Sequence, residues 1–92
     1  MRIQVEYFAQ AREAAECAGE TVILTDGATL LDLALTLAAK HGPRLAQLLL
    51  GPDCGLSRHI LFTVGDSQVA PGVAVRLADG DRVTIVPPIS GG

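Results

Sequence analysis

The last seven residues, VPPISGG, are the part of this sequence whose composition best fits a chemical role. Pro87 and Pro88 favour an extended backbone without internal hydrogen bonds. Gly91 and Gly92 carry no side chain, so they could pass a constriction that admits nothing larger. Residues 87–92, extended at about 3.3 Å each, would project about 20 Å and present a carboxylate at their end.

A free carboxylate is a poor electrophile and needs activation before it can react. A partner enzyme would convert the Gly92 carboxylate to an acyl-adenylate, and sulfide could then displace the leaving group to form a thiocarboxylate, a sulfur nucleophile. Delivery into a narrow channel would protect the intermediate from water. The segment therefore predicts a carrier tail whose catalytic partners lie in other proteins. The alternative is a chain end without function, as many domains have.

The other potentially reactive side chains form no recognisable site in the sequence. His41 and His59 have no carboxylate or cysteine at metal-ligand spacing, so we expect structural or solvent-exposed roles and no metal. Cys17 and Cys54 fall outside C-x-x-C spacing and are expected to be reduced thiols, Cys17 packed on a helix and Cys54 exposed in a loop. The sequence Asp79–Asp81 predicts a hairpin turn rather than a carboxylate pair.

The composition indicates one small ordered domain. Its 92 residues are 49% hydrophobic and 18% charged, with a net charge of -3, which allows a modest core. One tyrosine, two phenylalanines, no tryptophan and no basic run argue against nucleic-acid binding. No apolar stretch approaches the roughly 20 residues of a membrane span. The N-terminal residues form a strand pattern rather than a signal peptide, so a cytoplasmic protein is expected.

Hydrophobic periodicity predicts the elements that would support the tail. Period-two alternation indicates strands, and a run with helical spacing begins at Thr29, where Asp32 completes a capping signal, and ends at Gly42. The expected elements are strands at 2–8, 20–25, 59–64 and 82–86, a short helix at 9–19 closed by Gly19, the main helix at 29–42, and one or two helical turns at 43–50.

This order predicts an α+β fold of the β-grasp type, with a mixed sheet of about five strands covered by one main helix. The last strand is expected to return beside the first, in the middle of the sheet. A ferredoxin-like roll is the alternative, but it would prefer a second long helix. Residues 1–86 would form the domain and residues 87–92 its extended C-terminal tail.

Three stretches resemble the small subunits of molybdopterin synthase, which belong to the ubiquitin-like sulfur carriers. They are FAQARE after the first strand, DGDRV before the last, and PPISGG at the end, and the resemblance covers essentially the whole chain. It implies a β-grasp fold, adenylation of Gly92 by an E1-like enzyme that uses ATP, and conversion to a thiocarboxylate with a sulfur donor system. The implied tail residues are Pro87, Pro88, Ile89 (usually Val or Thr in the family), Ser90 and Gly91.

The resemblance further implies that the tail inserts into the large synthase subunit and donates sulfur to the dithiolene of molybdopterin. No cofactor would be bound by the chain itself. Related carriers serve thiamine, cysteine, siderophore or tRNA thiolation pathways, and others modify proteins, so these alternatives stay open. The thiamine-type carrier typically lacks the FAxxRE stretch, which favours the molybdopterin interpretation. Docking is expected to need an apolar patch on the third to fifth strands, because a tail alone buries too little surface.

Overall fold

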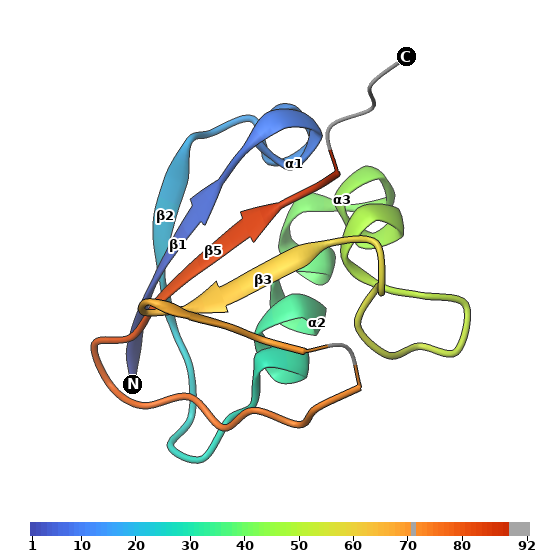
Figure 1. The fold of residues 1–92 in the computed structure, drawn as a ribbon. Helices are drawn as coiled ribbons and strands as arrows, with labels where there is room; N and C mark the ends of the chain where they lie inside the picture. The colour runs from blue at the N-terminus through green and yellow to red at the C-terminus, as the bar shows by residue number, and fades with distance from the viewer. Residues whose placement is uncertain (71, 89–92) are drawn as a thin grey trace.

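A mixed sheet forms one layer of the molecule, and the helices α2 and α3 cover one of its faces (Figure 1). The computed structural model describes residues 1–70 and 72–88. In chain order the elements are β1 (Arg2–Tyr7), α1 (Ala9–Ala15), β2 (Gly19–Ile23), α2 (Leu30–His41), α3 (Pro43–Leu49), β3 (Leu61–Val64), β4 (Ser67–Gln68) and β5 (Arg82–Val86).

The last strand lies in the centre of the sheet, whose order is β2-β1-β5-β3-β4. β5 runs parallel to β1 and antiparallel to β3, and the β1–β2 and β3–β4 pairs are antiparallel. This confirms the predicted α+β β-grasp arrangement. Within the described residues, no second long helix competes with α2, since α3 has only 7 residues.

The core lies between the sheet and the helices. Alternate residues of β1 point into it, and α2 contributes one apolar face, as the spacing predicted. Each large side chain buried in this way stabilises the fold by about 1.5–3 kcal/mol. The most deeply buried side chains include Ile3, Val5, Tyr7, Leu30, Leu33, Leu37, Leu45, Leu49, Val83 and Ile85.

A capping box starts α2, as the sequence predicted. The Asp32 amide donates to Thr29 Oγ1 at 3.1 Å, and the Thr29 amide donates to Asp32 Oδ2 at 2.9 Å. These two bonds satisfy donors that the first helical turn would otherwise leave unpaired. The helix ends at Gly42, whose φ of 96° lies in a region that favours glycine.

Thr29→Ala is expected to lower the free energy of unfolding by about 1 kcal/mol, because it removes one of the two capping bonds. Urea unfolding followed by circular dichroism measures this change. Thr36→Ala is the matched control: Thr36 lies on the exposed side of the same helix, and its hydroxyl donates to the Asp32 carbonyl. A change of about 0.5 kcal/mol or less is expected for the control; equal losses would contradict the capping argument.

Two predicted boundaries are wrong. α1 ends at Ala15 with Glu16 in the left-handed region (φ 60°), earlier than the predicted end at Gly19. Gly19 instead begins β2, where a Cβ would lie 2.7 Å from the Val5 carbonyl oxygen, so close strand packing requires glycine there. The third strand begins at Leu61 rather than at His59.

The Asp79–Asp81 turn is not a hairpin, because residues 72–78 form a loop that contains no strand. Asp79 Oδ1 accepts from the Arg2 amide at 2.7 Å, and Asp81 Oδ2 accepts from the Ala78 amide at 2.8 Å. The two carboxylates therefore bind backbone donors and fix the entry into β5. No helix in the described part of the chain is both long enough and apolar enough to cross a membrane.

Candidate functional site

The central strand β5 leads directly to the predicted tail. The Phe8 amide donates to the Ile85 carbonyl at 3.1 Å, so the end of β5 is held by the chain that follows β1. Pro87 is fully buried and Pro88 is exposed. The other predicted tail residues, at positions 89–92 and including the reactive Gly92, lie outside the described residues, so their roles stay predictions.

An apolar hollow of about 420 Å³ lies where β5 ends. Its walls come from β3 and the residues before it, from β4 and the residue after it, and from the end of β5. The lining residues are Arg58, His59, Ile60, Leu61, Gln68, Val69, Val86, Pro87 and Pro88.

An apolar row crosses the outer face of the sheet beside this hollow. Leu61 on β3 is the register partner of Val86 on β5. Phe8 lies level with Val86, because the residue before it, Tyr7, pairs with Ile85. Phe8 is 44% exposed and Leu61 is 37% exposed. We call these three residues, with Pro88, the exit surface.

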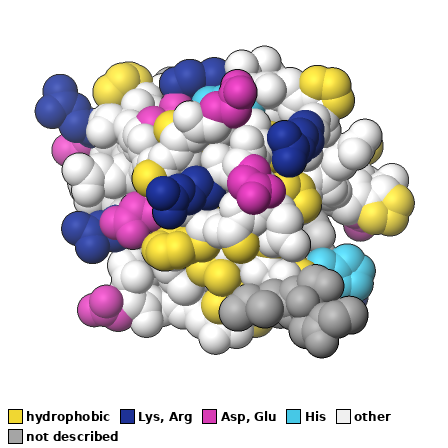
Figure 2. Space-filling model, turned by 90° about the horizontal axis from the view of Figure 1, so that it is seen from above, with side chains coloured by type: hydrophobic (Ala, Val, Ile, Leu, Met, Phe, Trp, Pro, Cys, Tyr) yellow, Lys and Arg dark blue, Asp and Glu magenta, His cyan; other side chains and the backbone are white. Residues whose placement is uncertain are grey.

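The exit surface is confined to one end of the sheet. Further along the same face, Arg82 and Glu6 form an ion pair with 3.4 Å between Nε and Oε1. Viewed from above, one group of hydrophobic side chains lies in the lower part of the molecule, below charged side chains of both signs, and other hydrophobic side chains are scattered at the upper and right edges (Figure 2). The predicted apolar patch on the third to fifth strands therefore has a counterpart in the structure, on β3 and β5.

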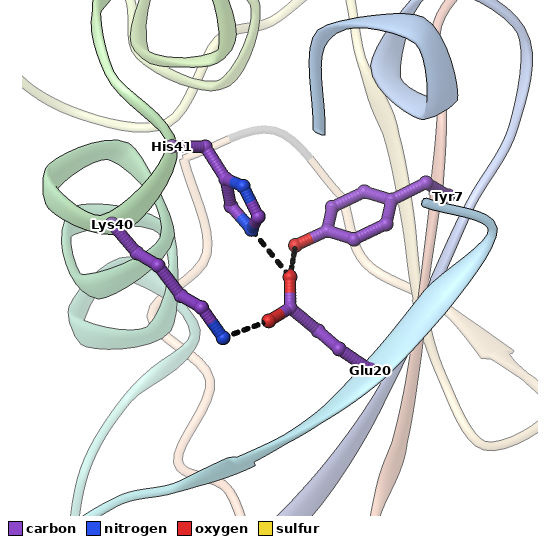
Figure 3. A network of polar contacts seen from close by, with 4 residues as sticks. All are labelled: Tyr7, Glu20, Lys40 and His41. Carbon is purple, nitrogen blue, oxygen red and sulfur yellow. Dashed lines mark hydrogen bonds and ion pairs between the residues drawn. The ribbon is translucent and has the colours of Figure 1, made fainter. Parts of the chain in front are cut away.

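A second cluster of functional groups lies between the sheet and the end of α2 (Figure 3). The Tyr7 hydroxyl on β1 donates to Glu20 Oε2 on β2 at 2.6 Å. His41 Nε2 lies 2.5 Å from the same oxygen, and Lys40 Nζ donates to Glu20 Oε1. The Glu20 and His41 side chains are only 12% and 14% exposed.

These contacts determine the ionisation of the cluster. Burial alone would raise the pKa of Glu20, but hydrogen bonds from Lys40, Tyr7 and His41 outweigh it and lower the pKa to about 2. Burial, reinforced by the hydrogen bond to the Glu20 carboxylate, raises the pKa of Tyr7 far above its usual range. The hydrogen bond to Glu20 also raises the pKa of Lys40. The carboxylate is therefore ionised at neutral pH, and Tyr7 remains a hydrogen-bond donor.

Sequence spacing did not reveal this cluster. His41 has no carboxylate or cysteine at metal-ligand spacing in the sequence, but the fold brings one of each close to it: ligand atoms of Cys17, Glu20 and His41 all lie within 4.8 Å of one another. One signal was present in the sequence. Glu20 shares the alternation of Val22 and Leu24, so it occupies a core-facing position on β2, where a charged residue requires polar partners.

Comparison with known proteins matches residues 5–92 to the ThiS family. A molybdopterin synthase sulfur carrier subunit of Chlamydomonas reinhardtii is 37% identical over the full length of both chains. The crystal structure of SAMP1 from Haloferax volcanii has a TM-score of 0.86 and 29% identity, with both chains fully covered.

A putative molybdopterin converting factor, subunit 1, from Pyrococcus furiosus has a TM-score of 0.76 and 25% identity. The match covers 97% of this chain and 99% of that one. These likenesses extend over the whole β-grasp domain and are not confined to one motif. The chain belongs to the ThiS family and is a full-length homologue of a molybdopterin synthase sulfur carrier subunit.

Proposed function

We propose that this chain carries sulfur as the small subunit of a molybdopterin synthase. An E1-like enzyme would join the Gly92 carboxylate to the α-phosphate of ATP and release pyrophosphate. Sulfide supplied by a sulfur donor system would then attack the acyl carbon and expel AMP, leaving a thiocarboxylate. The large synthase subunit would take up the tail and transfer this sulfur into the dithiolene of molybdopterin, formed from cyclic pyranopterin monophosphate.

The full-length likeness to the algal sulfur carrier subunit is the observation that carries this proposal. The fold supports it, because β5 is the central strand and leads the chain out at one end of the sheet. Pro87 is buried in the body of the domain, so the segment that enters a partner would begin at Pro88. Residues 88–92 would span at most about 17 Å when extended.

The exit surface supports docking of the large subunit. Leu61 lines the same hollow as Pro88, and Phe8 exposes further apolar area at this end of the sheet, where a partner that takes up the tail would have to lie. A stable interface buries roughly 800 Å² on each partner, which is more than a five-residue tail supplies. The large subunit would therefore cover the exit surface as well as the tail, which adds apolar burial to the contacts within the channel.

Intact mass spectrometry tests the carrier chemistry. After incubation with the activating enzyme, ATP and a sulfur donor, we expect the mass gain that corresponds to replacing one oxygen by sulfur. The chain without Gly92 is the control and is expected to show no gain. Adding the large subunit and cyclic pyranopterin monophosphate should then return the mass to its original value and yield molybdopterin. Sulfur transfer only with thiazole synthase or cysteine synthase would contradict the proposed pathway while preserving the carrier role.

The likeness to an archaeal small modifier protein favours protein modification as a second candidate. Gly92 would then be joined to lysine side chains of other proteins. Lys40, the single lysine of the chain, is engaged by Glu20, which disfavours chains built from this protein alone. Immunoblots of cell extracts for adducts of higher mass, compared with the chain lacking Gly92, separate the two functions.

A further inference from the structure

Three different metal-ligating groups converge beside the end of α2. The thiol of Cys17, a carboxylate oxygen of Glu20 and a ring nitrogen of His41 all lie within 4.8 Å of one another. In a tetrahedral zinc site with bonds of about 2.0–2.3 Å, ligand atoms are about 3.3–3.8 Å apart. Small side-chain rotations would therefore bring these three atoms around one ion, without movement of the strands or the helix.

The surroundings of Glu20 resemble the support that protein metal sites have. Tyr7 donates to one carboxylate oxygen and Lys40 to the other, so two groups that are not ligands hold the carboxylate in position. His41 Nε2 already faces Glu20 Oε2 at 2.5 Å. A metal ion would replace this direct contact, bind both atoms, and leave the Lys40 and Tyr7 bonds in place.

Cys17 gives the cluster access to solvent. It lies in the loop between α1 and β2, just after Glu16, whose left-handed backbone ends the helix. With residues of α1, Cys17 also lines a hollow of about 540 Å³. An ion could enter from this side, and a water molecule could occupy a fourth ligand position there.

We propose that Cys17, Glu20 and His41 form a binding site for a divalent transition metal, with Zn²⁺ as the preferred ion. A thiolate and an imidazole select zinc over the hard cations Mg²⁺ and Ca²⁺. Two anionic ligands balance the charge of the ion, and the thiol loses its proton on binding. The bound ion would join the α1–β2 loop, β2 and the end of α2. This site is independent of the sulfur-carrier function.

Titration of the untagged, reduced full-length chain with Co²⁺ tests the site. We expect one equivalent to produce a thiolate-to-cobalt charge-transfer band, and Zn²⁺ to abolish it by displacement. Cys17→Ser should remove the band. Cys54→Ser is the matched control, because Cys54 is the second free cysteine and is exposed, and this variant should keep the band. Absence of the band in the wild-type chain, or its loss in Cys54→Ser, would overturn the proposal.

Tyr7→Phe tests the site without removing a ligand. Loss of the hydroxyl that orients Glu20 is expected to lower Zn²⁺ affinity about tenfold in competition titrations, while the cobalt spectrum keeps its shape. Circular dichroism monitors folding of each variant. If Cys17→Ser fails to fold, the Zn²⁺ affinity of Tyr7→Phe tests the site instead. A Zn²⁺ affinity equal to that of the wild-type chain would contradict the proposed site. No sulfur donor or partner protein is present, so failure here leaves the proposed function untouched.

Discussion

Leu61→Asp is expected to weaken binding to the large synthase subunit about 100-fold without unfolding the domain. Leu61 is 37% exposed and lies beside Val86 in the exit surface, so a partner that covers the end of β5 would desolvate the new carboxylate. Burying an unpaired charge in an apolar interface at a central position costs about 3 kcal/mol, and each 1.4 kcal/mol corresponds to about tenfold in affinity. Isothermal titration calorimetry with the purified large subunit measures this loss.

Ile23→Asp is the matched control for Leu61→Asp. Ile23 is more exposed, at 69%, but lies on the edge strand β2, paired with Arg2 and separated from β5 by β1. The same chemical change there is expected to alter affinity about threefold or less, as for residues outside an interface core. Thermal unfolding checks that both variants are folded. Equal losses for the two variants, or wild-type affinity for Leu61→Asp, would contradict docking at the exit surface.

The fold could be predicted because its strongest elements carry strong local signals. Alternation in β1 and β5 and the Thr29–Asp32 capping pair act over a few residues, and these signals agree with the tertiary structure. The predicted end of α1 is wrong because its local signal, a glycine, is compatible with two structures. Gly19 fits a helix end as well as a strand start, and only the approach of the Val5 carbonyl decides between them.

The two candidate sites also differ in whether their signal is local in the sequence. The tail could be proposed from the sequence alone, because its two prolines and two glycines lie within six consecutive positions, where the prolines favour an extended backbone and the glycines carry no side chain; its role stays a prediction. The Glu20 cluster could not be predicted from sequence spacing, because Tyr7 and His41 lie 13 and 21 positions away from Glu20. The register of β1 with β2 and the packing of α2 bring them together. A core-facing charge on a strand is the signal that indicates such a cluster without identifying its partners.

Glu20→Gln is expected to remove about 2 kcal/mol of stability at pH 7 and to flatten the acid dependence of unfolding. The folded-state pKa of Glu20 is about 2, below its ordinary value of 4.5. Stability from its ionised form is therefore fully present above about pH 4.5 and is lost as the pH falls toward 2. The full difference in pKa would correspond to about 3 kcal/mol of stability. Solvent screens the contact with the exposed Lys40 side chain, so the smaller loss of about 2 kcal/mol is expected.

Urea unfolding between pH 2 and pH 7, with a chelator present, measures this contribution. The wild-type and Glu20→Gln curves should converge as the pH falls from about 4.5 to about 2, because protonation removes the same charge that the substitution removes. Glu13→Gln is the control, since Glu13 forms an exposed ion pair with Arg44 at 3.8 Å and the substitution should change stability by about 0.5 kcal/mol or less. Parallel wild-type and Glu20→Gln curves would mean that the Glu20 charge does not hold β2 to α2, and packing alone would then account for that contact.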